Sequence, residues 1–137
     1  MTELKGPSKA MHIFLWIAQV LLAGILAWGA AEKLFRPISG LAAMWPWAGQ
    51  IPAVFVRATG LIDLAGAAGL ILPALLRIRP KLTPIAAVAV IVLMICAGAF
   101  HIIRGEAAVI GANIFFAAIA AFIAWGRFYK APVTGRL

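Results

Sequence analysis

The chain has 137 residues, of which 65% are hydrophobic and only 12% are charged. This composition is too apolar for an ordinary soluble domain and predicts an integral membrane protein. The formal net charge is +8, but the basic residues stand at the ends of hydrophobic stretches, where topology signals lie, so we do not expect nucleic-acid binding.

A membrane-spanning helix needs about 20 apolar residues, and four stretches of about this length follow one another along the chain. They cover residues 11–31, 53–76, 82–103 and 107–126. We therefore predict an all-α, four-transmembrane-helix bundle that forms a single membrane domain over residues 1–137. The first stretch is longer than the apolar core of a signal peptide, so we expect it to be retained as a helix.

The first stretch ends in charged residues and leads into an aromatic segment. Glu32 and Arg36 are four residues apart, and this spacing predicts an ion pair on one helix face. Residues 38–51 include Trp45 and Trp47, which are typical of the boundary between membrane and water. The sequence leaves open whether this segment lies along the surface or enters the mouth of the bundle.

The second stretch carries one carboxylate, Asp63, inside an otherwise apolar helix. Small side chains let a neighbouring helix approach closely, so we expect Asp63 to face protein rather than lipid. An acid inside the membrane indicates either a functional site or a structural ion pair. Arg57 precedes Asp63 by six residues and should lie on a different face. The neighbours of Asp63 one turn away are all small: Thr59, Gly60, Gly66 and Ala67.

The third and fourth stretches carry few polar residues. Cys96 is the only cysteine, so it cannot form an intramolecular disulfide, and we expect a small buried hydrophobic residue there. His101 follows Ala97 and Gly98, which predicts an inward, closely packed position near the helix end. A lone histidine at such a place is more typical of a structural residue than of a metal ligand. Asn113 begins the fourth stretch.

The distribution of Lys and Arg predicts the topology. The side that carries both termini has the larger share of these residues, which by the positive-inside rule places both termini in the cytoplasm. That side carries Lys5, Lys9, Arg77, Arg79, Lys81, Arg127, Lys130 and Arg136, whereas the other carries Lys33, Arg36, Arg57 and Arg104.

The unusual polar residues converge on the outer side when the helices alternate in direction. They predict an outer pocket with Asp63 at its floor, although such a network also serves as a structural one. Their spacing matches no compact metal motif, and the basic members would repel a cation, so we expect no metal. No nucleophile–base pair is recognisable, so we assign no catalytic residue and favour a role other than a stand-alone enzyme. The candidates are Asp63, His101, Arg57, Lys33, Glu32, Asn113, Arg104 and Glu106.

Five short segments follow one another along the chain: Leu34–Pro37, Gly60–Pro73, Leu82–Ala87, Phe100–Glu106 and Ala124–Phe128. This ordered set resembles the DoxX-like family of small bacterial membrane proteins. The resemblance implies a four-helix bundle of the bacterial cytoplasmic (inner) membrane, and it carries the polar positions of that family onto Lys33, Arg57, Asp63, His101 and Glu106. Family members usually have Glu at the place of Asp63.

The resemblance also implies a link to membrane redox processes, because the family takes its name from a subunit associated with thiosulfate:quinone oxidoreductase. Our first hypothesis is an accessory subunit that binds a quinone or lipid-like ligand and associates with a membrane oxidoreductase. It would have no covalently bound cofactor. The alternatives are a small membrane enzyme or carrier that uses Asp63 and His101 for proton transfer, and a purely structural bundle. The small-residue faces are also compatible with a homo-oligomer.

Overall fold

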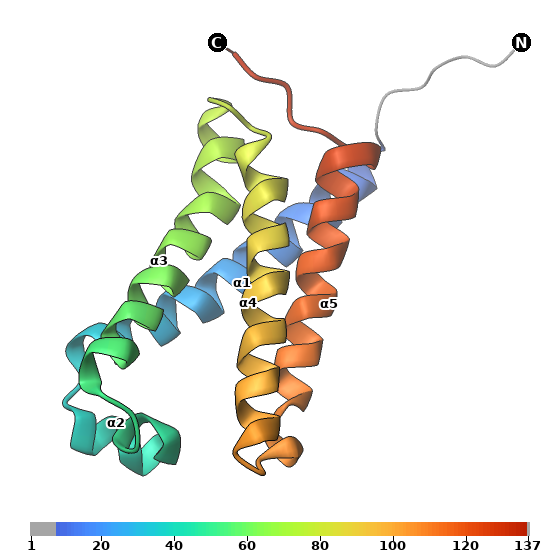
Figure 1. Ribbon diagram of the computed structural model, residues 1–137. Coiled ribbons are helices and arrows are strands. Elements are labelled where there is room, and N and C mark those ends of the chain that lie inside the picture. The colour runs from blue at the N-terminus through green and yellow to red at the C-terminus, as the bar shows by residue number, and fades with distance from the viewer. Residues whose placement is uncertain (1–7, 137) are drawn as a thin grey trace, which may run out of the picture.

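The computed structural model describes residues 8–136, and within that range it is helical without strands (Figure 1). Four of its helical segments are long and apolar enough to cross a membrane, which confirms the predicted four-helix bundle. Short 3₁₀ turns, Pro46–Gly49 and Ala107–Val109, and a π-helical turn, Gly126–Lys130, complete the chain. The helices are α1 (Lys9–Phe35), α2 (Ile38–Met44), α3 (Ala53–Leu76), α4 (Leu82–Ile103) and α5 (Gly111–Trp125).

Local sequence explains where the helices begin and end. The hydroxyl of Ser8 accepts a hydrogen bond from the Met11 amide at 3.0 Å, which caps α1 and starts it before residue 11. Pro37 follows the end of α1, and Pro52 stands just before α3, as the missing N–H of proline favours. The fourth predicted stretch begins with a 3₁₀ turn and becomes α-helical only at Gly111.

The long helices pack around a core of small and aliphatic residues. α1 crosses the bundle obliquely and lies against α3 and α5, while α4 lies between α3 and α5 (Figure 1). This core excludes polar side chains along most of its length. Its buried members are Leu22, Ala23, Leu26, Ala67, Leu70, Ala87, Val90, Ala120, Ile123 and Ala124.

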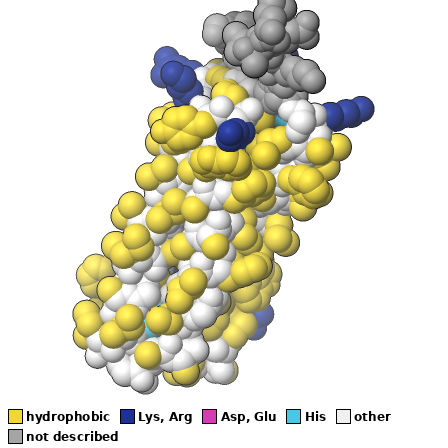
Figure 2. All heavy atoms as spheres, turned by 90° about the vertical axis from the view of Figure 1, so that its right-hand side faces the viewer, with side chains coloured by type: hydrophobic (Ala, Val, Ile, Leu, Met, Phe, Trp, Pro, Cys, Tyr) yellow, Lys and Arg dark blue, Asp and Glu magenta, His cyan; other side chains and the backbone are white. Residues whose placement is uncertain are grey.

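The outer surface of the bundle is also apolar. Phe14, Phe55, Ile95 and Phe115 each expose more than half of their surface, and hydrophobic side chains cover the face that Figure 2 shows. Such a surface fits lipid rather than water. Cys96 belongs to it: the side chain is exposed, so the expectation of a buried cysteine was wrong, because lipid-facing and core-facing positions are equally apolar here.

The bundle has two distinct ends. Lys9, the α3–α4 turn and the C-terminal residues lie together at one end, called the terminal end below, and α2 lies at the other, called the α2 end (Figure 1). Residues 38–51 pack through their own small cluster of Leu41, Ala48 and Val56. The aromatic residues of this segment reach α4, so it covers part of the α2 end. Placement of the terminal end in the cytoplasm stays a prediction.

Candidate functional site

The centre of the site is an ion pair between α1 and α3. The ammonium nitrogen of Lys33 lies 2.8 Å from Oδ2 of Asp63, and both side chains are largely buried. The prediction that Asp63 faces protein is confirmed, since only 5% of the residue is exposed. Its partner is Lys33 of α1, one of the candidate residues that the sequence placed on the same side of the bundle. The pair satisfies a carboxylate that would be very costly alone in an apolar helix.

Small residues let the two helices approach closely enough to form this pair. A Cβ atom added to Gly60 would lie 2.9 Å from the Cβ of Lys33, and one added to Gly29 would lie 3.5 Å from Oδ2 of Asp63. The contact at Gly60 is too short for a side chain, whereas the distance at Gly29 is an ordinary van der Waals contact. Gly60 therefore sets the distance at which Lys33 of α1 reaches Asp63 of α3.

Arg57 closes the end of α1. Its Nη1 donates to the carbonyl oxygen of Lys33 at 2.6 Å and to that of Arg36 at 2.8 Å. The last carbonyls of a helix have no partner within the helix and carry partial negative charge. Arg57 thus neutralises the partial negative charge at the end of α1. It binds the backbone carbonyl of Lys33, whereas Asp63 binds the Lys33 side chain.

A row of aromatic rings lies over the ion pair. Trp45 and Trp47 are stacked, with centroids 6.2 Å apart and an interplanar angle of 17°. The ammonium of Lys33 lies 5.9 Å from the ring centroid of Trp45 and 5.8 Å from that of Trp47, within range of a cation–π interaction. Trp28 meets Trp45 edge-on, and Trp47 meets both Phe100 and His101 of α4.

His101 belongs to a second polar group at the end of α4. Its Nδ1 lies 3.3 Å from Oε1 of Glu106, and Nε of Arg104 donates to the same oxygen at 2.7 Å. Arg104 also donates to the side-chain oxygen of Gln50, which joins α4 to the segment before α3. The hydrogen bond from Arg104 lowers the pKa of Glu106 below its ordinary value, so Glu106 remains an acceptor at neutral pH.

The structure therefore divides the predicted residues into two groups that meet through Trp47. Lys33, Asp63 and Arg57 form one group, and His101, Arg104 and Glu106 form the other. Among residues 8–136, no hydrogen bond joins His101 to Asp63.

Two predicted residues lie outside both groups. Glu32 forms its ion pair with Arg36, as the four-residue spacing predicted. The buried side-chain nitrogen of Asn113 has no hydrogen-bond partner within the described chain.

The row of aromatic rings can contact a flat group that has polar atoms at its rim. Within residues 8–136 no three His, Cys, Asp or Glu side chains lie close enough together to hold a metal ion. Stacked indoles offer a surface for a planar ring. The Lys33 ammonium lies over the faces of Trp45 and Trp47, and the His101 ring makes a T-shaped contact with Trp47, so both residues bring hydrogen-bonding nitrogen atoms near these rings.

Sequence reasoning missed a third polar group, at the terminal end. Arg127 is only 3% exposed, and its Nε donates to Oε1 of Gln19 at 2.7 Å. Its position near a helix end, between aromatic residues, indicated only a basic boundary residue. Gln19 gave a partial signal, since an amide inside an apolar span requires partners, and its Nε2 also donates to the Leu70 carbonyl at 2.7 Å.

Comparison with known proteins places most of the chain in one family. A model of the DoxX-like family matches residues 17–123. This range includes all eight predicted site residues, and it excludes Arg127. No curated protein and no solved structure matches the chain.

Proposed function

The chain belongs to the DoxX-like family, and from this premise we propose that it is an accessory membrane subunit that holds the ring of a quinone at the α2 end. The single observation that carries the proposal is the stacked pair Trp45 and Trp47, with the Lys33 ammonium and the His101 ring each beside Trp47. A planar ring stacks on indole, and quinone oxygens accept hydrogen bonds at their edges.

The donors for these oxygens follow from the contacts already made. A lysine ammonium has three N–H donors, and Asp63 takes one of those of Lys33. His101 has Nδ1 beside the Glu106 carboxylate, which only accepts, so Nδ1 carries the proton. Nε2 of His101 then accepts a hydrogen bond in the neutral ring and donates one in the charged ring. Both residues retain capacity for a ligand.

The Lys33–Asp63 pair supports the site rather than performing chemistry in the proposal. The carboxylate is buried and already bound to Lys33, so its role is to position the ammonium beneath the indole rings. We do not propose proton transfer between Asp63 and His101, because no hydrogen bond links them within residues 8–136.

The subunit would work with a membrane oxidoreductase, which would carry out electron transfer while this chain holds the quinone near the membrane surface. The apolar outer surface of the four helices implies contact with the lipid bilayer. The proposal includes the bacterial inner membrane and cytoplasmic termini, which rest on the distribution of Lys and Arg.

Retention of quinone by purified protein tests the proposal. Wild type, Trp47→Leu and Trp125→Leu are reconstituted in nanodiscs that contain ubiquinone, purified again, extracted and analysed by mass spectrometry. Trp125 is a matched control, since it is a partly exposed indole on α5 that takes no part in the row of rings over Lys33. Loss of one stacking partner should weaken binding by about fivefold, because such contacts contribute about 1 kcal/mol.

The expected result is reduced quinone per protein for Trp47→Leu and an unchanged ratio for Trp125→Leu, with thermal midpoints close to wild type. Equal quinone in wild type, both variants and protein-free nanodiscs would show that the row of rings does not bind quinone. A loss common to both variants would indicate general disturbance of the bundle and would also contradict the proposal.

A further inference from the structure

The terminal end holds a buried guanidinium that no carboxylate neutralises within residues 8–136. The side chain of Arg127 donates to three neutral acceptors: Oε1 of Gln19 at 2.7 Å, the Ala131 carbonyl at 2.8 Å, and Nδ1 of His12 at 2.9 Å. Its Nη2 is buried without a hydrogen-bond partner in this part of the chain. A buried charge of this kind is costly unless an opposite charge compensates it.

The backbone has an unusual conformation where it places this side chain. α5 ends in a π-helical turn, Gly126–Lys130, closed by a hydrogen bond from the Ala131 amide to the Gly126 carbonyl at 2.7 Å. Such turns are rare in proteins, and those that do occur often lie at functional sites. Gly126 packs directly on Leu15, where any side chain would collide. The turn brings Arg127 inward to α1, although its neighbours Phe128 and Tyr129 are exposed.

Arg127 determines which nitrogen of His12 is available. A guanidinium only donates, so Nδ1 of His12 must accept through its lone pair. The proton of the neutral imidazole is then on Nε2, which makes Nε2 a donor. The ring of Trp16 lies against the same guanidinium, with its centroid 5.6 Å from Cζ of Arg127.

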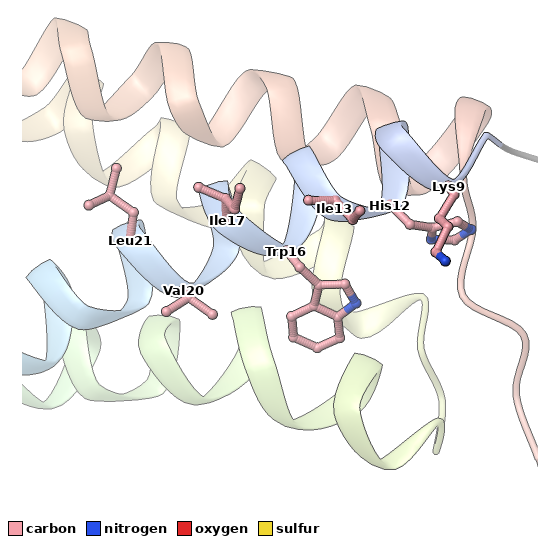
Figure 3. A pocket seen from close by; sticks show the side chains of 7 residues that line it. All are labelled: Lys9, His12, Ile13, Trp16, Ile17, Val20 and Leu21. Atoms are coloured by element: carbon pink, nitrogen blue, oxygen red, sulfur yellow. The ribbon is translucent and has the colours of Figure 1, made fainter.

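His12 and Trp16 both line two adjoining hollows at this end. One hollow, of about 410 Å³, is closed by Arg77, Ala74 and Leu75 from the end of α3 and by Pro132, Val133 and Thr134 of the C-terminal segment. The other, of about 610 Å³, follows one face of α1. Figure 3 shows its side chains in a row, with Lys9 and His12 at one end and Val20 and Leu21 at the other.

We propose that the terminal end binds an anionic glycerophospholipid, with its phosphate in the hollow between His12 and Arg77 and one acyl chain along the α1 groove. Within a mostly apolar lining, the smaller hollow presents the basic side chain of Arg77 and the ring of His12. His12 contacts Arg127, which no carboxylate neutralises within residues 8–136. The adjoining groove is lined by the exposed apolar residues Ile13, Ile17, Val20 and Leu21. A hollow that holds a basic side chain and adjoins an apolar groove matches a charged head group attached to a hydrocarbon chain.

The charge distribution favours a phosphate over an uncharged head group. Lys9, Arg77 and Arg127 belong to this end. The carboxylates of Glu32, Asp63 and Glu106 form their ion pairs nearer the α2 end, with Arg36, Lys33 and Arg104. Glu3 lies outside the described residues. Guanidinium and imidazole N–H groups form charge-assisted hydrogen bonds with phosphate oxygens. This site is separate from the proposed quinone site, and neither proposal depends on the other.

The turn between α3 and α4 offers two matched variants. Arg77 and Arg79 are both exposed and both have positive φ, 55° and 47°, which asparagine tolerates better than most residues. Arg77 lines the smaller hollow, and Arg79 does not. The changes Arg77→Asn and Arg79→Asn therefore remove the same charge from the same turn, and only the first removes it from the proposed site.

Native mass spectrometry of the full chain in mild detergent measures the binding of phosphatidylglycerol and of phosphatidylcholine with the same acyl chains. Wild type should retain more phosphatidylglycerol than phosphatidylcholine. Arg77→Asn should reduce retention of phosphatidylglycerol by about fivefold, since each basic residue near a phospholipid surface contributes about 1 kcal/mol. Arg79→Asn should resemble wild type.

Three outcomes would overturn the proposal. Equal retention of the two lipids by wild type would exclude recognition of an anionic head group. Equal loss from Arg77→Asn and Arg79→Asn would show only a general effect of charge. Displacement of phosphatidylglycerol by inorganic phosphate, tested up to millimolar concentration, would show that the hollow binds a free anion and that the α1 groove contributes nothing.

Discussion

Removal of the Asp63 charge should destabilise the bundle more than removal of any surface charge. The change Asp63→Asn keeps the size of the side chain and leaves the ammonium of Lys33 without its carboxylate, 2.8 Å away in the wild type. The Lys33 side chain is only 16% exposed. Water therefore replaces the lost partner poorly, and the glycines at the α1–α3 contact leave little room for rearrangement.

The expected magnitude follows from the distance between the charges. At 2.8 Å and an effective dielectric constant of about 20, the attraction between two unit charges is about 6 kcal/mol. Desolvation of both groups offsets part of this attraction, and removal of one partner from a buried pair typically costs about 3–5 kcal/mol. We expect a loss near 3 kcal/mol, at the lower end of that range, because Lys33 retains some exposure to solvent.

Reversible unfolding in mixed micelles measures this loss, with wild type, Asp63→Asn, Lys33→Met and the double variant compared in one series. The double variant removes both charges and should recover much of the stability lost in Asp63→Asn, since no unpaired ion remains. A loss below about 1 kcal/mol for Asp63→Asn would refute the reasoning, because the pair would then behave like an exposed one. Failure of the double variant to recover stability would show that the charge of Lys33 is not the source of the cost.

Two further predictions concern helix contact and pH. Gly60→Leu should lower the free energy of unfolding by about 1–3 kcal/mol, which is the usual cost of overpacking, because the new Cβ would lie 2.9 Å from the Cβ of Lys33. The control in the same unfolding assay is Gly24→Leu, whose new Cβ has no atom within 4 Å. The pKa of Glu106 is lowered from 4.5 by its hydrogen bond from Arg104, so its contribution to stability is present above pH 4.5 and is lost as the pH falls through the lower folded-state pKa. The thermal midpoint of wild type should therefore fall toward that of Glu106→Gln on acidification, and a constant difference between pH 7 and pH 3 would contradict the assignment.

Hydrophobic length and the placement of charges determined the fold class from sequence alone. Four apolar stretches have no stable alternative to helices in lipid, because backbone groups there must be satisfied within each segment. The small residues around Asp63 indicated correctly that it faces another helix, and the spacing of Glu32 and Arg36 indicated their pair. These features depend on local periodicity, which the chain order contains directly.

Partners between helices depended on the tertiary structure. The spacing of Arg57 and Asp63 already placed them on different faces, but it did not identify Lys33 as the partner; the crossing of α1 and α3 brings Lys33 to Asp63. The apolar composition of all faces also concealed that Cys96 lies on the exposed surface of the bundle. Arg127 resembles a boundary residue in sequence, and only the π-helical turn at the end of α5 rotates it inward to Gln19 and His12. Local sequence determines the helices of a membrane protein because backbone groups in lipid must form their hydrogen bonds within each segment. Side chains far apart in the chain come into contact only after the helices have packed.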